Sequence, residues 1–533
     1  MYATRCDGTA APIFLSRGTM TTLRSLARAA TTIVAVTVII VAPNAASPQA
    51  PNANALGAAT RGLALVDSAI DANGGLDRLR AVEDLTVRYR GRRWMAYQSK
   101  SAGPPWTTQP TLSDLVVDIR NDRVWRYTET RYPADFVFTS AQILRGQDAL
   151  IFDPTRAGFN DEIRRATGPQ NPTMALRREL PALELLQARD RPESVRWIGD
   201  RIEGGRRWNG VSYAQPNGAV YTLWIDVATK RLARLEWLRD DAVDGDQLAS
   251  YDYSGYRLEG TIPVPTRLVE RRNGDVVRDD SLAIAIDSRP ADSVFTPPAT
   301  GFAEGAPIKG PESEQVRKLA ENVWLLQQLP GGNRVMFVAF RDHVLVFEAP
   351  IPQAAATAVL DAVRRTVPGR PVRYVTFSHA HDDHAGGLRP YIAEGTTIVT
   401  TPGNRRFIER IARAKHTLRP DALSASAKAP VIETFTKKRV FTDGEMTVEL
   451  HDIGPTSHSD EIVMAYLPKQ RLIFQGDLLI LPPRGDPTPA NRLTAEFAQA
   501  IERLGLEVDA IAGVHGRVGT MADLRDALAR RQP

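Results

Sequence analysis

The chain has 533 residues, of which 43% are hydrophobic and 24% are charged. A chain of this length is too long for one hydrophobic core, so we expect two or more domains. The formal net charge is +5, but the 67 basic residues are scattered among 62 acidic residues and form no basic patch in the sequence. This distribution argues against a nucleic-acid partner.

The N-terminal segment has the layout of a secretory signal peptide. An alternative start at Met20 is followed by two arginines, an apolar run over residues 29–42 and small residues over 43–47. We therefore predict a signal peptide over residues 1–46 and a periplasmic or secreted protein, with no stable membrane span after cleavage. The alternative is an uncleaved membrane anchor, although an apolar run of about 14 residues is shorter than the roughly 20 that span a bilayer.

The cysteine content limits the chemistry of the mature protein. The sole cysteine, Cys6, lies before this leader. The mature chain is therefore expected to lack thiols, which rules out both disulfides and cysteine metal ligands.

Residues 61–300 form the first predicted domain, after a Pro/Ala/Asn-rich linker over residues 47–60. The region opens with apolar residues at helical spacing, and this pattern ends at Asn73-Gly74-Gly75. Strand-like runs follow, several of which alternate apolar and polar side chains, so we predict a mainly antiparallel sheet with one solvated face. The predicted strands cover residues 85–90, 115–119, 124–127, 220–226, 232–238, 251–257, 266–271 and 281–286.

The segment Ala69–Leu79, followed by meandering strands, resembles the lipoprotein-carrier-like proteins of the periplasm, in which a curved sheet faces a helix. The runs Leu223–Asp226 and Arg234–Trp237 are similar to adjacent strands in such sheets. The resemblance implies a sheet that could bind an apolar ligand. The alternative is a scaffold or lid for the region that follows. Because no histidine precedes His343, the domain is not expected to supply imidazole ligands.

A second linker, dense in proline and glycine, covers residues 301–315 and leads into the region 316–533. In this region the predicted strands alternate with helical stretches, which favours two sheets flanked by helices. A helix is predicted around Val359 and Val363 and ends at Pro368-Gly369. The predicted strands cover residues 323–329, 335–340, 344–347, 372–377, 398–400, 447–453, 461–467, 472–475 and 510–514.

A cluster of histidines directly follows the predicted strand 372–377, in the sequence His379-Ala380-His381-Asp382-Asp383-His384. His379 and His381 are two residues apart, so in an extended segment they point to the same side and can bind one ion. Asp383 and His384 follow the bend and can reach a second ion. All 8 histidines of the chain lie at or after His343, which makes chance clustering of polar loop residues the poorer explanation.

This His-x-His-x-Asp-His segment resembles the signature loop of the metallo-β-lactamase superfamily of hydrolases, and the resemblance extends over residues 316–533. Three later segments are similar to the family's remaining ligand loops and occur in the family's order: Gly454–Asp460 with His458, Leu472–Asp477 ending in Asp477, and Ala512–Gly516 with His515. The resemblance implies an α/β fold of the αββα sandwich type, here preceded by the antiparallel β domain. It implies one ion held by His379, His381 and His458, a second held by Asp383, His384 and His515, and Asp477 between them.

The implied ligands are imidazoles and carboxylates, which suit two zinc ions, although iron or manganese would accept the same set. In the family's mechanism a metal-bridging hydroxide attacks an electrophilic carbonyl or phosphorus centre, and Asp383 orients the nucleophile or moves its proton. The carboxylate at Asp477 resembles the broad hydrolase branches of the family more than true zinc β-lactamases, which usually carry cysteine or serine there.

Together with the predicted leader, the resemblance implies an exported dinuclear metal-dependent hydrolase that acts on an ester, lactone, thioester or related bond of a small molecule. The alternative is an envelope binding or carrier protein, in which the N-terminal β domain binds an apolar ligand and the metal domain is structural. The sequence leaves the oligomeric state open.

One segment departs from the family pattern. Where many members have Asp-x-Gly after an early strand, this chain has Glu348-Ala349-Pro350. The usual aspartate supports the metal loop by hydrogen bonding, so either Glu348 reaches the same place or this support is missing. Of the histidines outside the implied ligand set, His343 and His416 are expected at the solvated surface, and His451 is a candidate for supporting a ligand.

Overall fold

The computed structural model describes residues 53–134, 136–145, 148–154, 162–167, 179–299, 303–304, 315–426 and 428–531. The predicted signal peptide over residues 1–46 lies outside the described residues. Helix α1 (Ala53–Ala72) begins inside the first range predicted as linker, and strand β16 (Ala303–Glu304) lies inside the second. None of the helices in the described ranges is both long and apolar enough to cross a membrane.

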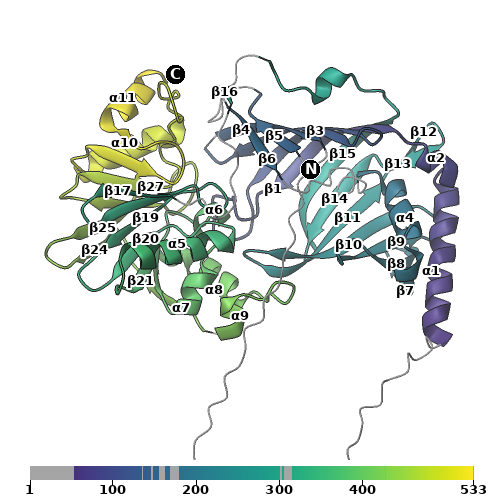
Figure 1. The fold of residues 1–533 in the computed structure, drawn as a ribbon, viewed down its shortest axis with the longest axis horizontal. Coiled ribbons are helices and arrows are strands. Elements are labelled where there is room, and N and C mark those ends of the chain that lie inside the picture. The colour runs from purple at the N-terminus through teal and green to yellow at the C-terminus, as the bar shows by residue number, and fades with distance from the viewer. Residues whose placement is uncertain are drawn as a thin grey trace, which may run out of the picture. The chain divides into compact units, whose positions relative to one another are not determined.

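The region after α1 builds one 14-stranded sheet (Figure 1). Its order is β16-β6-β5-β4-β3-β2-β1-β15-β14-β11-β10-β9-β8-β7, and every neighbouring pair is antiparallel except β16 and β6. The mainly antiparallel β domain is therefore confirmed. Its strands are β1 (Asp84–Trp94), β2 (Thr108–Asp118), β3 (Arg123–Tyr132), β4 (Phe136–Arg145), β5 (Asp148–Phe152), β6 (Glu162–Thr167), β7 (Arg196–Glu203), β8 (Arg206–Ala214), β9 (Val220–Asp226), β10 (Leu232–Asp241), β11 (Gly245–Ser254), β14 (Arg267–Arg272), β15 (Asp275–Ile286) and β16.

The two faces of this sheet differ in chemistry. Helices α1, α2 (Leu76–Arg80) and α4 (Pro181–Arg189) contribute to one apolar core with the sheet, in which Val66, Leu183 and Leu223 are buried. Elsewhere on the sheet the side chains are charged and partly exposed. There Arg234 donates to Glu203 at 2.8 Å and to Asp252 at 3.0 Å. The pattern matches the predicted sheet with one packed and one solvated face. A short hairpin, β12 (Arg257–Glu259) with β13 (Ile262–Val264), completes the domain together with η2 (Pro192–Ser194) and η3 (Asp292–Phe295).

Residues after 315 form two sheets with helices on their outer faces (Figure 1). Leu360 and Phe407 are buried between the first sheet and its helices, Phe347 and Phe474 between the two sheets, and Phe497 beneath the helices of the second. Three stacked cores of this kind define an αββα sandwich. The fold class implied by the resemblance is therefore confirmed.

The first sheet has the order β17 (Gln315–Ala320), β18 (Val323–Gln327), β19 (Val335–Ala339), β20 (Val344–Phe347), β21 (Val372–Thr376), β22 (Thr397–Thr400) and β23 (Val431–Thr434). The second has the order β24 (Lys438–Thr442), β25 (Thr447–Asp452), β26 (Val463–Leu467), β27 (Leu472–Gln475), β28 (Ala510–Gly513) and β29 (Gly519–Thr520). The helices are α5 (Gln353–Thr366), α6 (Asp382–Ala385), α7 (Arg389–Glu394), α8 (Arg405–Arg413), α9 (Ala422–Ser426), α10 (Arg492–Leu504) and α11 (Met521–Ala529), with η4 (Pro402–Asn404) before α8.

The turn between β10 and β11 contacts the segment that follows α8. Arg410 donates to Asp244 at 2.6 Å and to the Tyr97 hydroxyl at 2.9 Å. The carboxylate of Asp246 accepts hydrogen bonds from the backbone of Thr417 and Leu418. These charge-assisted hydrogen bonds fix the β domain to the sandwich beside the loop that carries Tyr97.

His416 belongs to the same contact. Its side chain is 4% exposed, and its Nδ1 lies 2.9 Å from the carboxylate of Asp240 on β10. The expectation of a solvated His416 is therefore wrong, because strand β10 covers a surface that the sequence of the sandwich alone leaves open. His343 is also largely covered, since its ring stacks on Phe340 with 4.7 Å between the centroids.

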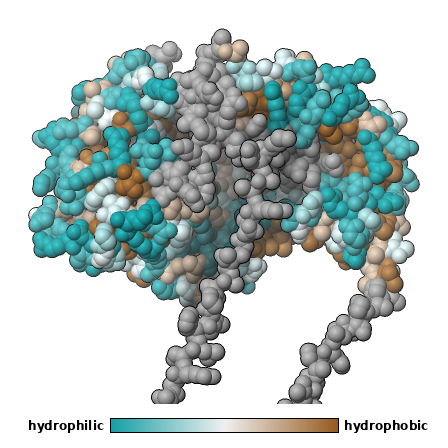
Figure 2. Space-filling model, in the orientation of Figure 1, coloured by the Kyte–Doolittle hydropathy of each residue, from teal (hydrophilic) through white to brown (hydrophobic). Residues whose placement is uncertain are grey.

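The coloured side chains of Figure 2 are mostly hydrophilic, and the apolar ones form small separate patches. The most exposed large apolar residues are Ile202, at 75% exposure, and Leu258, at 63%. Single exposed apolar side chains of this kind are normal on soluble domains and need no ligand to explain them.

Arg389 holds the three small helices of the sandwich together. Its guanidinium is 2% exposed, donates to both carboxylate oxygens of Asp421 and donates to the carbonyl oxygen of Ile411. Burial raises the pKa of Asp421, but the hydrogen bonds from Arg389 and Ser424 outweigh burial and lower it below 3.8. A lowered carboxylate pKa stabilises the fold above the unfolded-state pKa, and this stabilisation is lost as the pH falls through the lower folded-state pKa.

We predict that Asp421→Asn destabilises the fold by about 3 kcal/mol, because it leaves a buried guanidinium without its counter-charge. Urea unfolding at pH 7 measures the difference. The gap between wild type and variant should shrink below about pH 4, where Asp421 takes up a proton in the unfolded chain while the folded protein still holds the carboxylate ionised. A gap that stays constant down to pH 2 would contradict this account.

Candidate metal centre

Four loops at one edge of the sandwich bring the seven sequence-predicted ligands together. His379 and His381 follow β21, and α6 carries Asp383 and His384. The remaining three ligands come from the loops after β25, β27 and β28, and are His458, Asp477 and His515. They form two groups, in each of which the candidate ligand atoms lie within 4.8 Å of one another.

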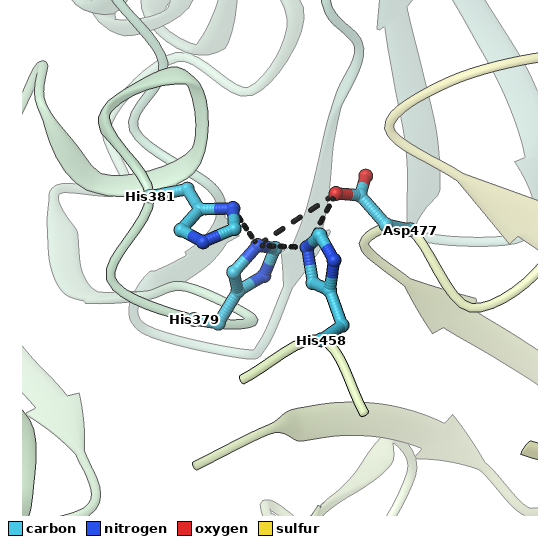
Figure 3. Close-up of side chains that lie close together, drawn as sticks. All are labelled: His379, His381, His458 and Asp477. Atoms are coloured by element: carbon cyan, nitrogen blue, oxygen red, sulfur yellow. Dashed lines mark hydrogen bonds and ion pairs between the residues drawn. The ribbon is translucent and has the colours of Figure 1, made fainter. Parts of the chain in front are cut away.

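In the first group three imidazoles and one carboxylate surround a common point (Figure 3). The Nε2 atom of His379 lies 2.9 Å from Nδ1 of His381 and 3.1 Å from Nε2 of His458. The Oδ2 atom of Asp477 lies 3.1 Å from Nε2 of His458. Each of these atoms has a lone pair available for a cation.

The second group contains Asp383, His384 and His515. Nε2 of His515 lies 3.3 Å from Oδ2 of Asp383, and Nε2 of His384 lies 3.5 Å from the same oxygen. Both imidazoles also approach the Oδ1 atom of Asp477, at 3.3 Å and 3.2 Å. Because its Oδ2 atom faces the first group, Asp477 lies between the two groups, as the resemblance implied.

These spacings fit divalent cations. Ligand bonds of about 2.0–2.1 Å in a tetrahedral arrangement place neighbouring donor atoms about 3.3 Å apart. The contacts named above, together with the 3.7 Å between Nε2 of His379 and Oδ2 of Asp477, range from 2.9 to 3.7 Å, and no two candidate ligand atoms of a group are more than 4.8 Å apart. In addition, Nε2 of His384 and Oδ1 of Asp477 are buried without a hydrogen-bond partner. Buried polar atoms are normally paired, and a bound cation would satisfy both of them.

Comparison with known proteins identifies this part of the chain. Residues 330–515 match the model of the metallo-β-lactamase superfamily. This region is a metallo-β-lactamase superfamily domain. A comparison with curated proteins returns no match.

Solved structures of metallo-β-lactamases are similar to part of the chain. A metallo-β-lactamase from Pontibacter korlensis is 20% identical, with 41% of this chain and 98% of that chain covered and a TM-score of 0.31. The metallo-β-lactamase FIM-1 from Pseudomonas aeruginosa, in its mono-zinc form, is 16% identical, with 40% and 93% covered and a TM-score of 0.30.

Glu348 supports the metal loop of the metallo-β-lactamase superfamily domain. Its side chain is buried, its Oε1 atom accepts from the backbone N–H of Ser378 at 3.1 Å, and its Oε2 atom lies 3.2 Å from Nδ1 of His384. With Nδ1–H of His384 donating to Glu348, the Nε2 lone pair is directed into the second group. The glutamate therefore reaches the place expected of the family's aspartate, from a backbone conformation with φ of 84°.

Two ligand histidines are oriented by backbone carbonyls of the β domain. Nε2 of His381 lies 3.0 Å from the carbonyl oxygen of Ser99, in the loop between β1 and β2. Nδ1 of His458 lies 3.1 Å from the carbonyl oxygen of Pro133, in the turn between β3 and β4. A carbonyl oxygen can only accept, so each contact assigns the N–H to that nitrogen and leaves the other nitrogen free for a cation.

Gln98 makes a third contact from the β domain. Its Nε2 atom donates to Oδ1 of Asp383 at 2.8 Å and to Oδ1 of Asp382 at 2.5 Å. The amide therefore holds the oxygen of Asp383 that faces away from His515. Nothing in the sequence pattern singles out Gln98, because it lies about 280 residues before its partners in a segment with no motif.

Charge and burial keep most ligands in their metal-binding form. Burial, then the neighbouring histidines, lowers the pKa of His379 well below 6.5, and burial with His458 lowers the pKa of His381 to about 3. Burial opposes ionisation of Asp383 and Asp477, but His384 lowers the pKa of both. Burial lowers the pKa of His384, yet Asp383 and Asp477 outweigh it and raise this pKa well above 6.5. A cation bound at His384 therefore replaces a proton.

A cleft of about 490 Å³ opens onto the centre. Asp383, His458, Asp477 and His515 line it, together with aromatic side chains of strands β3 and β4. Among these, burial and then Asp383 raise the pKa of Tyr132 to about 12, so its hydroxyl keeps its proton at neutral pH. The β domain thus forms part of the wall that faces the ligands.

His451 and the two serines beside His458 have structural contacts. His451 is buried and pairs with Glu449 at 2.9 Å, so it supports a strand of the second sheet and no ligand. Ser457 donates to Glu496, and Ser459 donates to the carbonyl oxygen of Glu461 within its own loop. These contacts shape the loop that carries His458.

We predict that Glu348→Gln weakens metal binding by about 10–100-fold, the range typical of changes beside a ligand. A carboxamide has one acceptor and one donor, so it loses one of the two hydrogen bonds that Glu348 accepts. Competition with a chromogenic chelator measures the affinity. Glu433→Gln is the control, because Glu433 is an exposed surface residue that pairs with Arg439. Equal affinity in wild type and Glu348→Gln would show that the buried carboxylate does not orient His384.

We predict that Gln98→Leu weakens binding of one cation by about 10-fold, since Asp383 loses the donor that orients it. The same titration resolves this loss if the two cations bind stepwise. Gln109→Leu, in strand β2 of the same domain, is the matched control. A uniform loss in both variants would indicate a general effect on the β domain instead of a local one on Asp383.

Proposed function

We propose that this chain is an exported hydrolase that uses two divalent cations to cleave an ester, lactone, thioester or related bond. The observation that carries this proposal is the pair of donor groups that share Asp477. Two cations bound there would lower the pKa of water from 15.7 to about 7 and polarise the attacked oxygen. Membership of the superfamily supports metal-dependent hydrolysis in general.

The residues of the chain have distinct roles in this proposal. The rings of His379, His381 and His458 would bind one cation, and His384 and His515 would bind the second together with Asp383. Asp477, which lies between the two groups, would contribute an oxygen to each. Asp383 is the group that accepts a proton from the attacking water, because its carboxylate is ionised and its orientation is held by Gln98.

The donor chemistry favours zinc. Five imidazoles and two carboxylates form the set, and zinc binds nitrogen and oxygen ligands with open positions left for water and substrate. Iron and manganese accept similar ligands, so elemental analysis of the purified protein decides between the three metals.

We propose that the N-terminal β domain is a structural part of the hydrolase and not a carrier. Its apolar core is filled by side chains of α1, α4 and the sheet, including Val66, Leu183 and Leu223. Its loops contact the metal centre through Ser99 and Pro133. These two observations support a scaffold that completes the centre.

We propose a location in the periplasm or outside the cell, on the strength of the leader pattern before residue 47. N-terminal sequencing of the protein from a fractionated expression host tests this directly. A mature N-terminus near Ala46 in the periplasmic fraction supports export, and an intact leader in the cytoplasmic fraction contradicts it.

We predict that His381→Ala lowers hydrolysis by more than about 100-fold, since losing a ligand should exceed the 10–100-fold effect of changing a residue beside one. A panel of esters, lactones, thioesters and phosphodiesters identifies the activity, and metal content is measured in the same samples. Chelation should abolish hydrolysis and added zinc should restore it in the wild type. The matched control is His451→Ala, a buried histidine outside the centre. Wild-type protein that binds no stoichiometric metal would end the proposal.

A further inference from the structure

Arg334 lines the same cleft as the metal-ligand candidates. Its backbone N–H donates to the carbonyl oxygen of Val514 at 3.1 Å, directly before His515. The preceding residue, Asn333, donates from its side chain to the carbonyl oxygen of Asp383 at 2.6 Å. These two hydrogen bonds attach the loop that carries Arg334 to both segments that carry the second donor group.

The guanidinium of Arg334 lacks an acidic partner among the residues that the structure describes. Burial, then the cation Arg317, lowers its pKa, and no carboxylate opposes this shift. Two other arginines with little exposure are paired, Arg234 with Asp252 and Arg389 with Asp421. A guanidinium stays charged in proteins, and a partly desolvated charge without a counter-ion is unfavourable until an anion binds.

Aromatic rings from the β domain lie near the other donor group. Phe136 packs edge-on against the ring of His458, with 5.7 Å between the centroids. Phe138 stacks beside Phe136 at 6.2 Å and meets Tyr132 edge-on at 5.5 Å. All three rings line the cleft. Such a surface favours an apolar or aromatic group and gives it no charged partner.

We propose that the cleft takes a substrate with a carboxylate that pairs with Arg334 and an apolar or aromatic body that packs on Phe136 and Phe138. This inference rests on the hydrolase function proposed above and names its substrate class. The geometry of the two donor groups places the scissile bond between these ends, because Phe136 contacts a ligand of one group and Arg334 is attached to the loops of the other.

One guanidinium in the cleft matches the single charge of a carboxylate better than the charge of about −2 of a phosphate monoester. Arginine also presents two parallel N–H donors that suit both carboxylate oxygens. The structure therefore assigns to the cleft an amphipathic, singly anionic ester, lactone or thioester.

The test uses pairs of aromatic esters that are identical except for a carboxylate or a carboxamide on the aromatic body. Wild type should prefer the carboxylate by about 10–100-fold in kcat/KM, as expected for a charge-assisted hydrogen bond. Arg334→Met should remove this preference, mainly through a higher KM for the carboxylate ester, with both cations still bound. Arg334→Lys should keep part of the preference, because it keeps the charge without the paired donors.

A binding measurement separates the subsite from direct binding of the carboxylate to a metal. Calorimetry with 4-phenylbutyrate on the metal-loaded protein should show an affinity loss of about 10-fold or more in Arg334→Met. Phe138→Ala should weaken binding of 4-phenylbutyrate and leave acetate unaffected. Arg206→Met, at an exposed position of the β domain, is the control and should bind as the wild type does.

The outcomes distinguish this inference from the proposed function. Two bound cations with equal affinities of wild type and Arg334→Met for 4-phenylbutyrate overturn the carboxylate subsite and leave the hydrolase intact. A wild-type protein without metal or hydrolysis overturns the function itself. A preference for the carboxamide in wild type overturns the assigned substrate class.

Discussion

The structure depends on the convergence of seven donor atoms that repel one another when no cation lies between them. Buried lone pairs of imidazoles and carboxylates, at separations near 3 Å, are unfavourable neighbours unless positive charge is placed among them. The three carboxylates around His384 raise its pKa, so a proton on this ring supplies part of the positive charge. Divalent cations supply it more completely, because each can accept several lone pairs at once. Binding of a metal at this centre would therefore be coupled to the folding of the four loops.

Convergence alone does not orient an imidazole, because either ring nitrogen can carry the proton. A hydrogen-bond acceptor on the side of the ring that faces away from the centre determines which nitrogen carries the proton. These acceptors come from two parts of the chain. Glu348 of the sandwich faces His384, whereas carbonyl oxygens of the β domain face His381 and His458. The metal-binding form of this centre is thus defined jointly by both parts of the chain. Farther from the centre, the hydrogen bonds between Arg410 and the β10–β11 turn also connect the β domain to the sandwich.

The sequence predicted which side chains converge because their signal is local. His379 to His384 lie within six residues, and the loops of His458, Asp477 and His515 each follow a recognisable strand. The strands with alternating side chains were also recognisable, and all eight predicted in the β domain are present. Strands β4 to β8 were missed. Of these, β7 is rich in charged side chains, and such a strand gives little apolar alternation to detect.

The contacts between the two parts could not be predicted for a different reason. Ser99 and Pro133 act through backbone carbonyls, which every residue has, so residue type carries no information about them. The burial of His416 depends on Asp240, 176 residues earlier in the chain. A single sequence shows which residues can bind a metal, but it does not show which distant backbone atoms will face them.

The hairpin of β3 and β4 joins metal binding to the shape of the cleft. Pro133 in its turn accepts from His458, Phe136 packs on the same ring, and Tyr132 and Phe138 line the cleft. A change in this turn therefore moves a ligand and the aromatic surface together, because both are fixed to the same few residues. Arg334 is independent of this hairpin, since its loop is attached to Val514 and Asp383. A change at Arg334 would consequently leave the first donor group undisturbed. A change in the aromatic surface would not, because Phe136 packs on the ring of His458.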